Sequence, residues 1–236
     1  MQRLVLLPGL LHDVRIWQPQ AAALTDYAHI FIGDLTLGDS IAAMAEGVLQ
    51  AAPSETFALA GLSMGGYVAL EIMRQAPERV TGLALLDTSA RPDTATTQEH
   101  RYADIHKART QFEQLVEELI PKQITADHYQ DEKLVGLIKE MAQNTGSEVF
   151  IRQQIAMANR ADSFPFLRDI HCPTLVLCGR EDVITPLGLH QEMVSEISNA
   201  GLVIVNDCGH LSTIEQPLRV NEALAQWLET IQSSAS

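Results

Sequence analysis

The stretch Gly61-Leu62-Ser63-Met64-Gly65-Gly66 decides the fold of this chain. It follows the apolar run 57–60 and precedes a helical pattern, so Ser63 is predicted to stand on a tight turn between a strand and a helix. Large side chains two positions before and after the serine would clash in such a turn, and glycine occupies both positions. The turn would hold the Ser63 hydroxyl above the edge of a sheet, which is where a nucleophile is needed.

Short apolar runs alternate with amphipathic helical patterns over much of the chain. Continuous apolar strands that alternate with helices are typical of a mainly parallel sheet covered on both faces. We therefore predict a three-layer α/β fold with about six strands. The strands are predicted at 4–7, 29–32, 56–60, 82–86, 174–178 and 202–205.

The alternation stops between Ala90 and Phe166, where the pattern is helical throughout. Apolar stripes at 112–119, 134–141 and 149–155 predict helices, and turn signals occur at Pro121 and at 144–146. We predict that residues 90–166 form a helical lid over the carboxyl edge of the sheet, inserted into a core made of residues 1–89 and 167–236. The alternative is a pair of long crossover helices within the core.

Composition excludes several classes of function. The 236 residues carry a formal charge of −14, which argues against nucleic acid and anionic membranes as partners. Three cysteines without a C-x-x-C pair predict neither a disulfide framework nor a zinc site, and they favour a reducing compartment, the cytoplasm. The N-terminal apolar run is broken at Pro8-Gly9, so we interpret it as a buried strand and not as a signal peptide. No phosphate loop, dinucleotide fingerprint or H-E-x-x-H pattern occurs, so we expect no cofactor and no metal.

Two further strand ends supply partners for Ser63, because functional residues gather at the carboxyl ends of parallel strands. The strand ending at Cys178 leads into a loop with Glu181 and Asp182, and we favour Asp182 as the acid that orients a histidine. Asp87, at another strand end, is a rival acid. The last strand leads to His210, which follows a glycine in a loop and could reach Ser63 as its base. The N–H of Met64, the residue after the serine, would donate to an oxyanion.

The order Ser63, Asp182, His210 resembles that of the α/β-hydrolase superfamily, in its small lid-bearing branch of esterases, lactonases and carbon–carbon hydrolases. The resemblance covers nearly the full length of the chain. The motifs that carry it are Gly61-x-Ser63-x-Gly65-Gly66, Gly179-Arg180-x-Asp182-x-x-x-Pro186, and Gly209-His210 with Glu215-x-Pro217.

This resemblance implies a backbone N–H of Leu10 as the second oxyanion donor. The chain departs from the superfamily in two ways, since Pro8-Gly9 stands where His-Gly is usual and the initial antiparallel hairpin is missing. The implied activity is hydrolysis of a small-to-medium, largely apolar carboxylic ester through an acyl-enzyme. Cleavage of a carbon–carbon bond or an enol-lactone by the same triad is the alternative among enzymes, and a ligand-binding receptor on this fold is the alternative outside them.

The expected partner is a small-molecule ester, and the sequence leaves the oligomeric state open. Leu11 follows the oxyanion position and is a candidate substrate contact. Arg152, in the lid pattern, is a candidate for facing a substrate carboxylate, although such an arginine more often lies on the solvated face of a helix.

Overall fold

The computed structural model describes residues 1–53 and 55–234, and within them six parallel strands form one sheet in the order β2-β1-β3-β4-β5-β6. This architecture confirms the predicted three-layer α/β fold with a six-stranded parallel sheet. The strands are β1 (Gln2–Leu7), β2 (Ala28–Ile32), β3 (Phe57–Leu62), β4 (Val80–Leu86), β5 (Thr174–Gly179) and β6 (Ala200–Val205).

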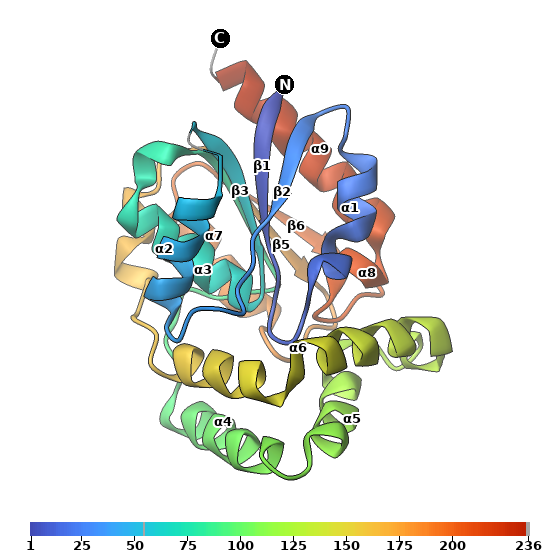
Figure 1. The fold of residues 1–236 in the computed structure, drawn as a ribbon. Coiled ribbons are helices and arrows are strands. Elements are labelled where there is room, and N and C mark those ends of the chain that lie inside the picture. The colour runs from blue at the N-terminus through green and yellow to red at the C-terminus, as the bar shows by residue number, and fades with distance from the viewer. Residues whose placement is uncertain (54, 235–236) are drawn as a thin grey trace.

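Helices cover both faces of the sheet (Figure 1). One face carries α2 (Ile41–Ala51), α3 (Met64–Gln75) and α7 (Leu187–Glu196). The other carries α1 (Gln18–Ala23), α8 (Ser212–Glu215) and α9 (Pro217–Ser234). Short 3₁₀ turns lie at Val14–Trp17, Pro77–Arg79, His128–Gln130 and Phe164–Asp169.

The alternation of side chains along each strand explains the two layers of core. In β1, Leu4 and Leu6 pack into the cluster under α1 and α9, whereas Val5 and Leu7 pack into the cluster under α2 and α3. All four side chains are fully buried. A strand that is buried on both faces is a continuous apolar run, which is why the sequence reveals these strands.

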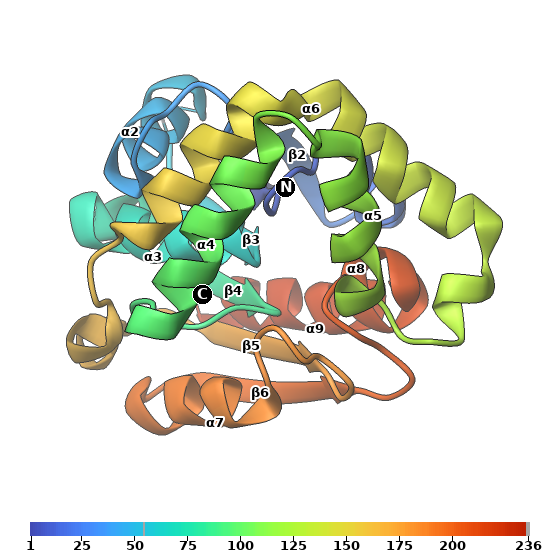
Figure 2. The ribbon, with the colours of Figure 1, turned by 90° about the horizontal axis from the view of Figure 1, so that it is seen from below.

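Three helices lie between β4 and β5 and cross the carboxyl ends of the strands (Figures 1 and 2). They are α4 (Ala95–Ala108), α5 (Phe112–Gln123) and α6 (Glu132–Ala158), and we call them the helical segment. Figure 2, seen from this side, shows α4, α5 and α6 in front of the strand ends. The site at that edge of the sheet therefore lies beneath helices.

The helical segment differs from the sequence expectation in three details. The apolar pattern does not predict the first helix, α4, as a separate element, because this helix is largely polar and buries only Ile105 and Ala108. The predicted turn at 144–146 is a kink inside α6, where Gly146 has a φ of 81°. Pro121 lies inside α5, which ends two residues later.

None of the helices in the described part of the chain combines the length and the apolar character that a membrane span requires.

Candidate active site

Ser63 stands on the turn between β3 and α3 with a φ of 52° and a ψ of −117°, a conformation that residues with a side chain rarely adopt. The neighbouring glycines make this turn possible. A Cβ on Gly61 would clash with the Gly65 backbone, and a Cβ on Gly65 would clash with the carbonyl groups of Leu7 and Pro8. Two bonds at 2.9 and 2.8 Å, from the Ser63 N–H to the Leu86 carbonyl and from the Thr88 hydroxyl to the Ser63 carbonyl, hold the turn against the end of β4.

The structure brings Ser63, His210 and Asp182 into one chain of contacts. His210 Nε2 lies 2.8 Å from the Ser63 hydroxyl oxygen, and His210 Nδ1 lies 2.8 Å from Asp182 Oδ2. The other carboxylate oxygen of Asp182 accepts the N–H groups of Ile184 and Thr185 at 2.8 and 3.0 Å. The carboxylate is therefore fixed by its own loop and can fix the ring in turn.

Burial and charge have opposite effects on the pKa values of His210 and Asp182. Burial by itself would lower the pKa of His210, but the charge and hydrogen bond of Asp182 outweigh it, so the pKa is raised above 6.5. Burial would raise the pKa of Asp182, but the charge of His210 and hydrogen bonds from His210 and Thr185 hold it below its usual value. An ionised carboxylate beside Nδ1 keeps a proton there and leaves Nε2 free to accept one from Ser63.

The two expected oxyanion donors are the N–H groups of Leu10 and Met64. Neither N–H has a hydrogen-bond partner among residues 1–53 and 55–234. Met64 is the first residue of α3, and the N–H groups of a first helical turn have no acceptor within their own helix. The positive end of the α3 dipole also lies at Ser63. Both donors are thus available to a substrate oxygen.

The other two acidic candidates, Glu181 and Asp87, accept hydrogen bonds from backbone N–H groups. Glu181 turns away from the ring and accepts the N–H of Cys208 at 2.9 Å. Asp87, fully buried at the end of β4, accepts the N–H of Gly179 at 2.9 Å and the N–H of Ser212 at 3.2 Å. One carboxylate thus ties the loop after β5, which carries Asp182, to the loop after β6, which carries His210.

Glu215 is a residue of the site that sequence reasoning missed, although it stands in a motif quoted above. Its Oε1 accepts the N–H groups of Gly209 and Leu211, on either side of His210, at 2.9 and 3.3 Å. Its Oε2 contacts the Thr125 N–H at 2.9 Å and His128 Nδ1 at 2.8 Å. The histidine loop is therefore fastened to the connection between α5 and α6.

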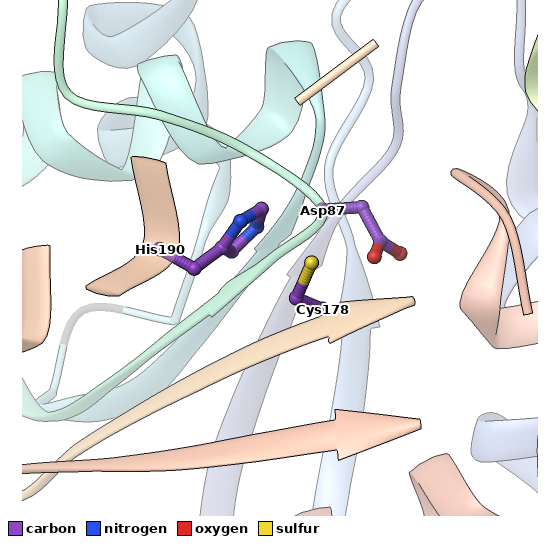
Figure 3. Close-up of side chains that lie close together, drawn as sticks. All are labelled: Asp87, Cys178 and His190. Atoms are coloured by element: carbon purple, nitrogen blue, oxygen red, sulfur yellow. The ribbon is translucent and has the colours of Figure 1, made fainter. Parts of the chain in front are cut away.

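One group of side chains has the composition of a metal site. Asp87, Cys178 and His190 are buried and have ligand atoms within 4.8 Å of one another (Figure 3). These atoms are engaged within the protein, since His190 Nε2 accepts the Thr88 N–H at 3.0 Å and the Cys178 thiol lies 3.0 Å from the Gly179 carbonyl. Burial also raises the pKa of the Cys178 thiol, whereas a metal binds the thiolate. The cluster fits a structural role better than an ion site.

The two candidate substrate contacts are engaged in packing the helical segment onto the core. Leu11 is buried with a φ of 62°, and its N–H donates to Gln153 Oε1 at 3.2 Å. Arg152 donates from Nη2 to the Thr36 carbonyl at 2.9 Å, in the loop after β2. Arg152 thus has a partner in the protein, and its predicted contact with a substrate carboxylate stays a prediction.

A parallel sheet with a serine on the turn after an inner strand defines a class of α/β proteins whose sites lie at the carboxyl edge. Residues 4–223 match the profile of the Alpha/beta hydrolase family, and the chain belongs to this family of hydrolases.

Known proteins that are similar to this chain in sequence or structure are named as esterases and as an enol-lactonase. The solved structure of a thermophilic esterase from Thermogutta terrifontis is 30% identical, with a TM-score of 0.92 over 98% of this chain and 90% of that one. Carboxylesterase YbfK from Bacillus subtilis is 27% identical over 95% of this chain and 79% of its own. An enol-lactonase from Burkholderia xenovorans shares the fold at 23% identity, with a TM-score of 0.87 over 97% of this chain and 92% of that one.

Proposed function

We propose that this protein is a serine carboxylesterase that cleaves small-to-medium, largely apolar esters through an acyl-enzyme. The observation that carries the proposal is the unbroken line of contacts from Asp182 through His210 to Ser63, with both distances at 2.8 Å. A line of this kind lets a neutral imidazole take the hydroxyl proton while the carboxylate stabilises the imidazolium.

In the proposed mechanism, the Ser63 oxygen attacks the ester carbonyl carbon as His210 Nε2 takes the hydroxyl proton. The N–H groups of Leu10 and Met64 bind the oxyanion of the tetrahedral intermediate, and losing one such donor costs about 3–4 kcal/mol of barrier. His210 then gives its proton to the departing alcohol. Water enters, loses a proton to His210 and attacks the acyl carbon, and His210 returns the proton to the Ser63 oxygen as the carboxylic acid leaves.

The substrate would bind between the carboxyl edge of the sheet and a lid formed by residues 90–166, which contain the helical segment. Leu11, Val116 and Ile138 lie on this side and are apolar and buried, which suits an apolar acyl or alcohol group. The formal charge of −14 disfavours strongly anionic substrates. The names of the Thermogutta esterase and of carboxylesterase YbfK support an ester as the substrate class.

Location and partners follow the sequence expectations. Cys172, Cys178 and Cys208 are free thiols, which fits a reducing compartment, and we propose the cytoplasm. The partner we propose is a small-molecule ester.

A screen of ester chain lengths tests the proposal, with a vinylogous diketone and an enol-lactone in the same assay. We expect turnover of short and medium esters, and a loss of roughly 10⁶-fold in kcat for Ser63→Ala. Turnover of the diketone or the lactone in preference to every ester would contradict the proposed substrate class. A burst of alcohol without turnover would instead favour a receptor.

A further inference from the structure

His12 is a buried histidine whose ring the proposed mechanism does not use. It lies in the loop between β1 and α1 and is 5% exposed. Neither Nδ1 nor Nε2 of the ring has a hydrogen-bond partner among the described residues. Buried polar side-chain atoms in folded proteins are nearly always hydrogen-bonded, so two unpartnered nitrogens on one ring need an explanation.

The ring lines a small cavity between the first loop and the helical segment. Gln123, at the end of α5, is the other polar side chain of its lining. The remaining lining side chains are apolar and come mostly from α5 and α6: Leu11, Val116, Leu119, Ile120, Ile138 and Ala142. The space open to the centre of a water-sized sphere is about 10 Å³, which is room for one group of the size of a hydroxyl.

This cavity adjoins the reacting groups on two sides. The point where a Cβ of Gly9 would stand is 2.9 Å from His12 Nδ1 and 3.3 Å from the Cβ of Ser63, so the ring and the serine flank the same glycine. Gln123 accepts the backbone N–H of His210 through its carbonyl oxygen at 2.8 Å. The two polar side chains of the cavity thus come from the segments that touch Ser63 and His210.

The protonation state of His12 decides what the ring can bind. Burial is the main cause that lowers the pKa of His12 to about 3, and the charge of His210 lowers it further. The ring is therefore neutral in neutral solution, with one nitrogen as donor and the other as acceptor. Such a ring matches a hydroxyl or keto oxygen and offers no positive charge to a carboxylate.

We propose that His12 and Gln123 form a polar subsite for one oxygen-bearing group of the substrate, a hydroxyl or keto oxygen close to the scissile ester. The inference rests on the proposed esterase function and narrows its substrate class. The size of the cavity limits the bound group to one oxygen, its apolar walls offer that oxygen no hydrogen bond, and the ring of His12 supplies the hydrogen bond that selects it. A methyl group in the same place would leave the two nitrogens of His12 without a partner, so the subsite discriminates against it.

Pairs of esters that differ by a hydroxyl in place of a methyl group test the subsite. Propyl 2-hydroxybutyrate and propyl 3-hydroxybutyrate are compared with the 2-methyl and 3-methyl esters, and 2-hydroxyethyl butyrate is compared with propyl butyrate. We expect the wild-type chain to prefer the hydroxyl member of at least one pair by about five- to tenfold in kcat/KM, the size of one neutral hydrogen bond. His12→Leu should bring that ratio close to one, and Gln123→Met should lower it in part.

Matched controls separate the subsite from a structural role. His29→Leu makes the same chemical change at an exposed position of β2 and should leave both the ratio and the rate unchanged. His12→Leu should keep or raise the Tm, because it removes two buried polar atoms without partners. A lower Tm with an unchanged ratio would assign the ring a structural role and overturn the proposal.

Binding of the same pairs to the Ser63→Ala chain, measured by calorimetry, separates the two proposals. A hydroxyl preference that His12→Leu abolishes in this background supports the subsite even if the wild-type chain hydrolyses none of the esters, in which case only the esterase function fails. Equal binding and equal rates within all three pairs would overturn the subsite, and so would a preference that survives His12→Leu.

Discussion

The two halves of the candidate site are held in different ways. Ser63 is fixed by its immediate neighbours in sequence, because Gly61 and Gly65 allow a turn that any side chain at either place would block. His210 is fixed by Glu215, a near neighbour in sequence, and from far along the chain by Gln123 and, through Ser212, by Asp87. Local sterics thus set the nucleophile, whereas the position of the base also depends on hydrogen bonds from distant segments. The comparison teaches that a short motif accounts for the position of Ser63, whereas part of what positions His210 is found only in the fold.

The largest effect should come from breaking the nucleophile turn with Gly65→Ala. The new Cβ would meet the carbonyl groups of Leu7 and Pro8, which are backbone atoms that cannot move aside. We expect loss of esterase activity and a fall in the free energy of unfolding of about 2–4 kcal/mol. Gly188→Ala in α7 is the control, because its Cβ would meet no atom of residues 1–53 and 55–234 within 4 Å, and this variant should keep activity and leave or raise the Tm. Full activity of Gly65→Ala would show that the turn tolerates a side chain.

The next effect should come from Asp182→Asn, which breaks the acid–base half without changing its shape. The new side-chain amide would turn an N–H toward His210 Nδ1, so the ring would carry its proton on Nε2 and could not accept one from Ser63. We expect kcat to fall by about 10⁴-fold with an unchanged Tm. Glu181→Gln is the matched control and should cost far less. Equal losses in the two variants would remove Asp182 from its proposed role.

A smaller effect is expected for Glu215→Gln, which weakens the fastening of the histidine loop. The amide keeps one acceptor oxygen but loses the charge that holds three N–H groups and His128. We expect kcat to fall roughly tenfold and the Tm to fall with it, as when charge-assisted hydrogen bonds become neutral. Glu222→Gln in α9, an exposed partner of Arg219, should change neither quantity. A kcat unchanged by Glu215→Gln would mean that the loop holds His210 without this residue.

The smallest effect concerns the pH profile. The base must be neutral, so kcat/KM should rise with pH through the pKa of His210, with a midpoint above 6.5. Burial, followed by the charge of Asp182, raises the pKa of Asp87 to about 7, and its negative charge above that pH helps to raise the pKa of His210. Asp87→Asn removes this charge and should move the midpoint to lower pH, whereas the exposed Asp26→Asn should leave it in place. A midpoint that moves upward would contradict this electrostatic account.

The sequence predicts the parts of the fold that local patterns determine. The inner strands are nearly continuous apolar runs because both faces of the sheet are covered there, and the Ser63 turn is marked by its glycines. The preference for Asp182 over Glu181 rests on position alone, and the two carboxylates do point to different partners. The predicted domain boundaries at 90 and 166 stay predictions, although α4, α5 and α6 fall within them.

The contacts that join distant segments could not be predicted in the same way. Glu215 meets Thr125 and His128 across about 90 residues, and no local pattern encodes that meeting. No sequence pattern indicates a role for His12. Only the fold shows that its ring is buried beside Ser63 and that neither ring nitrogen has a hydrogen-bond partner in the part of the chain that the structure describes. The helix α4 is hard to predict because a polar surface helix lacks the apolar stripe by which helices are found.

The most direct measurement is the reaction of the intact chain with a fluorophosphonate, followed by peptide mapping. A hydroxyl activated by His210 should form one adduct, at Ser63, and His210→Ala should slow its formation by several orders of magnitude. The adduct should be absent from Ser63→Ala. An adduct that persists in Ser63→Ala, or that forms at the same rate without His210, would contradict the proposed proton relay.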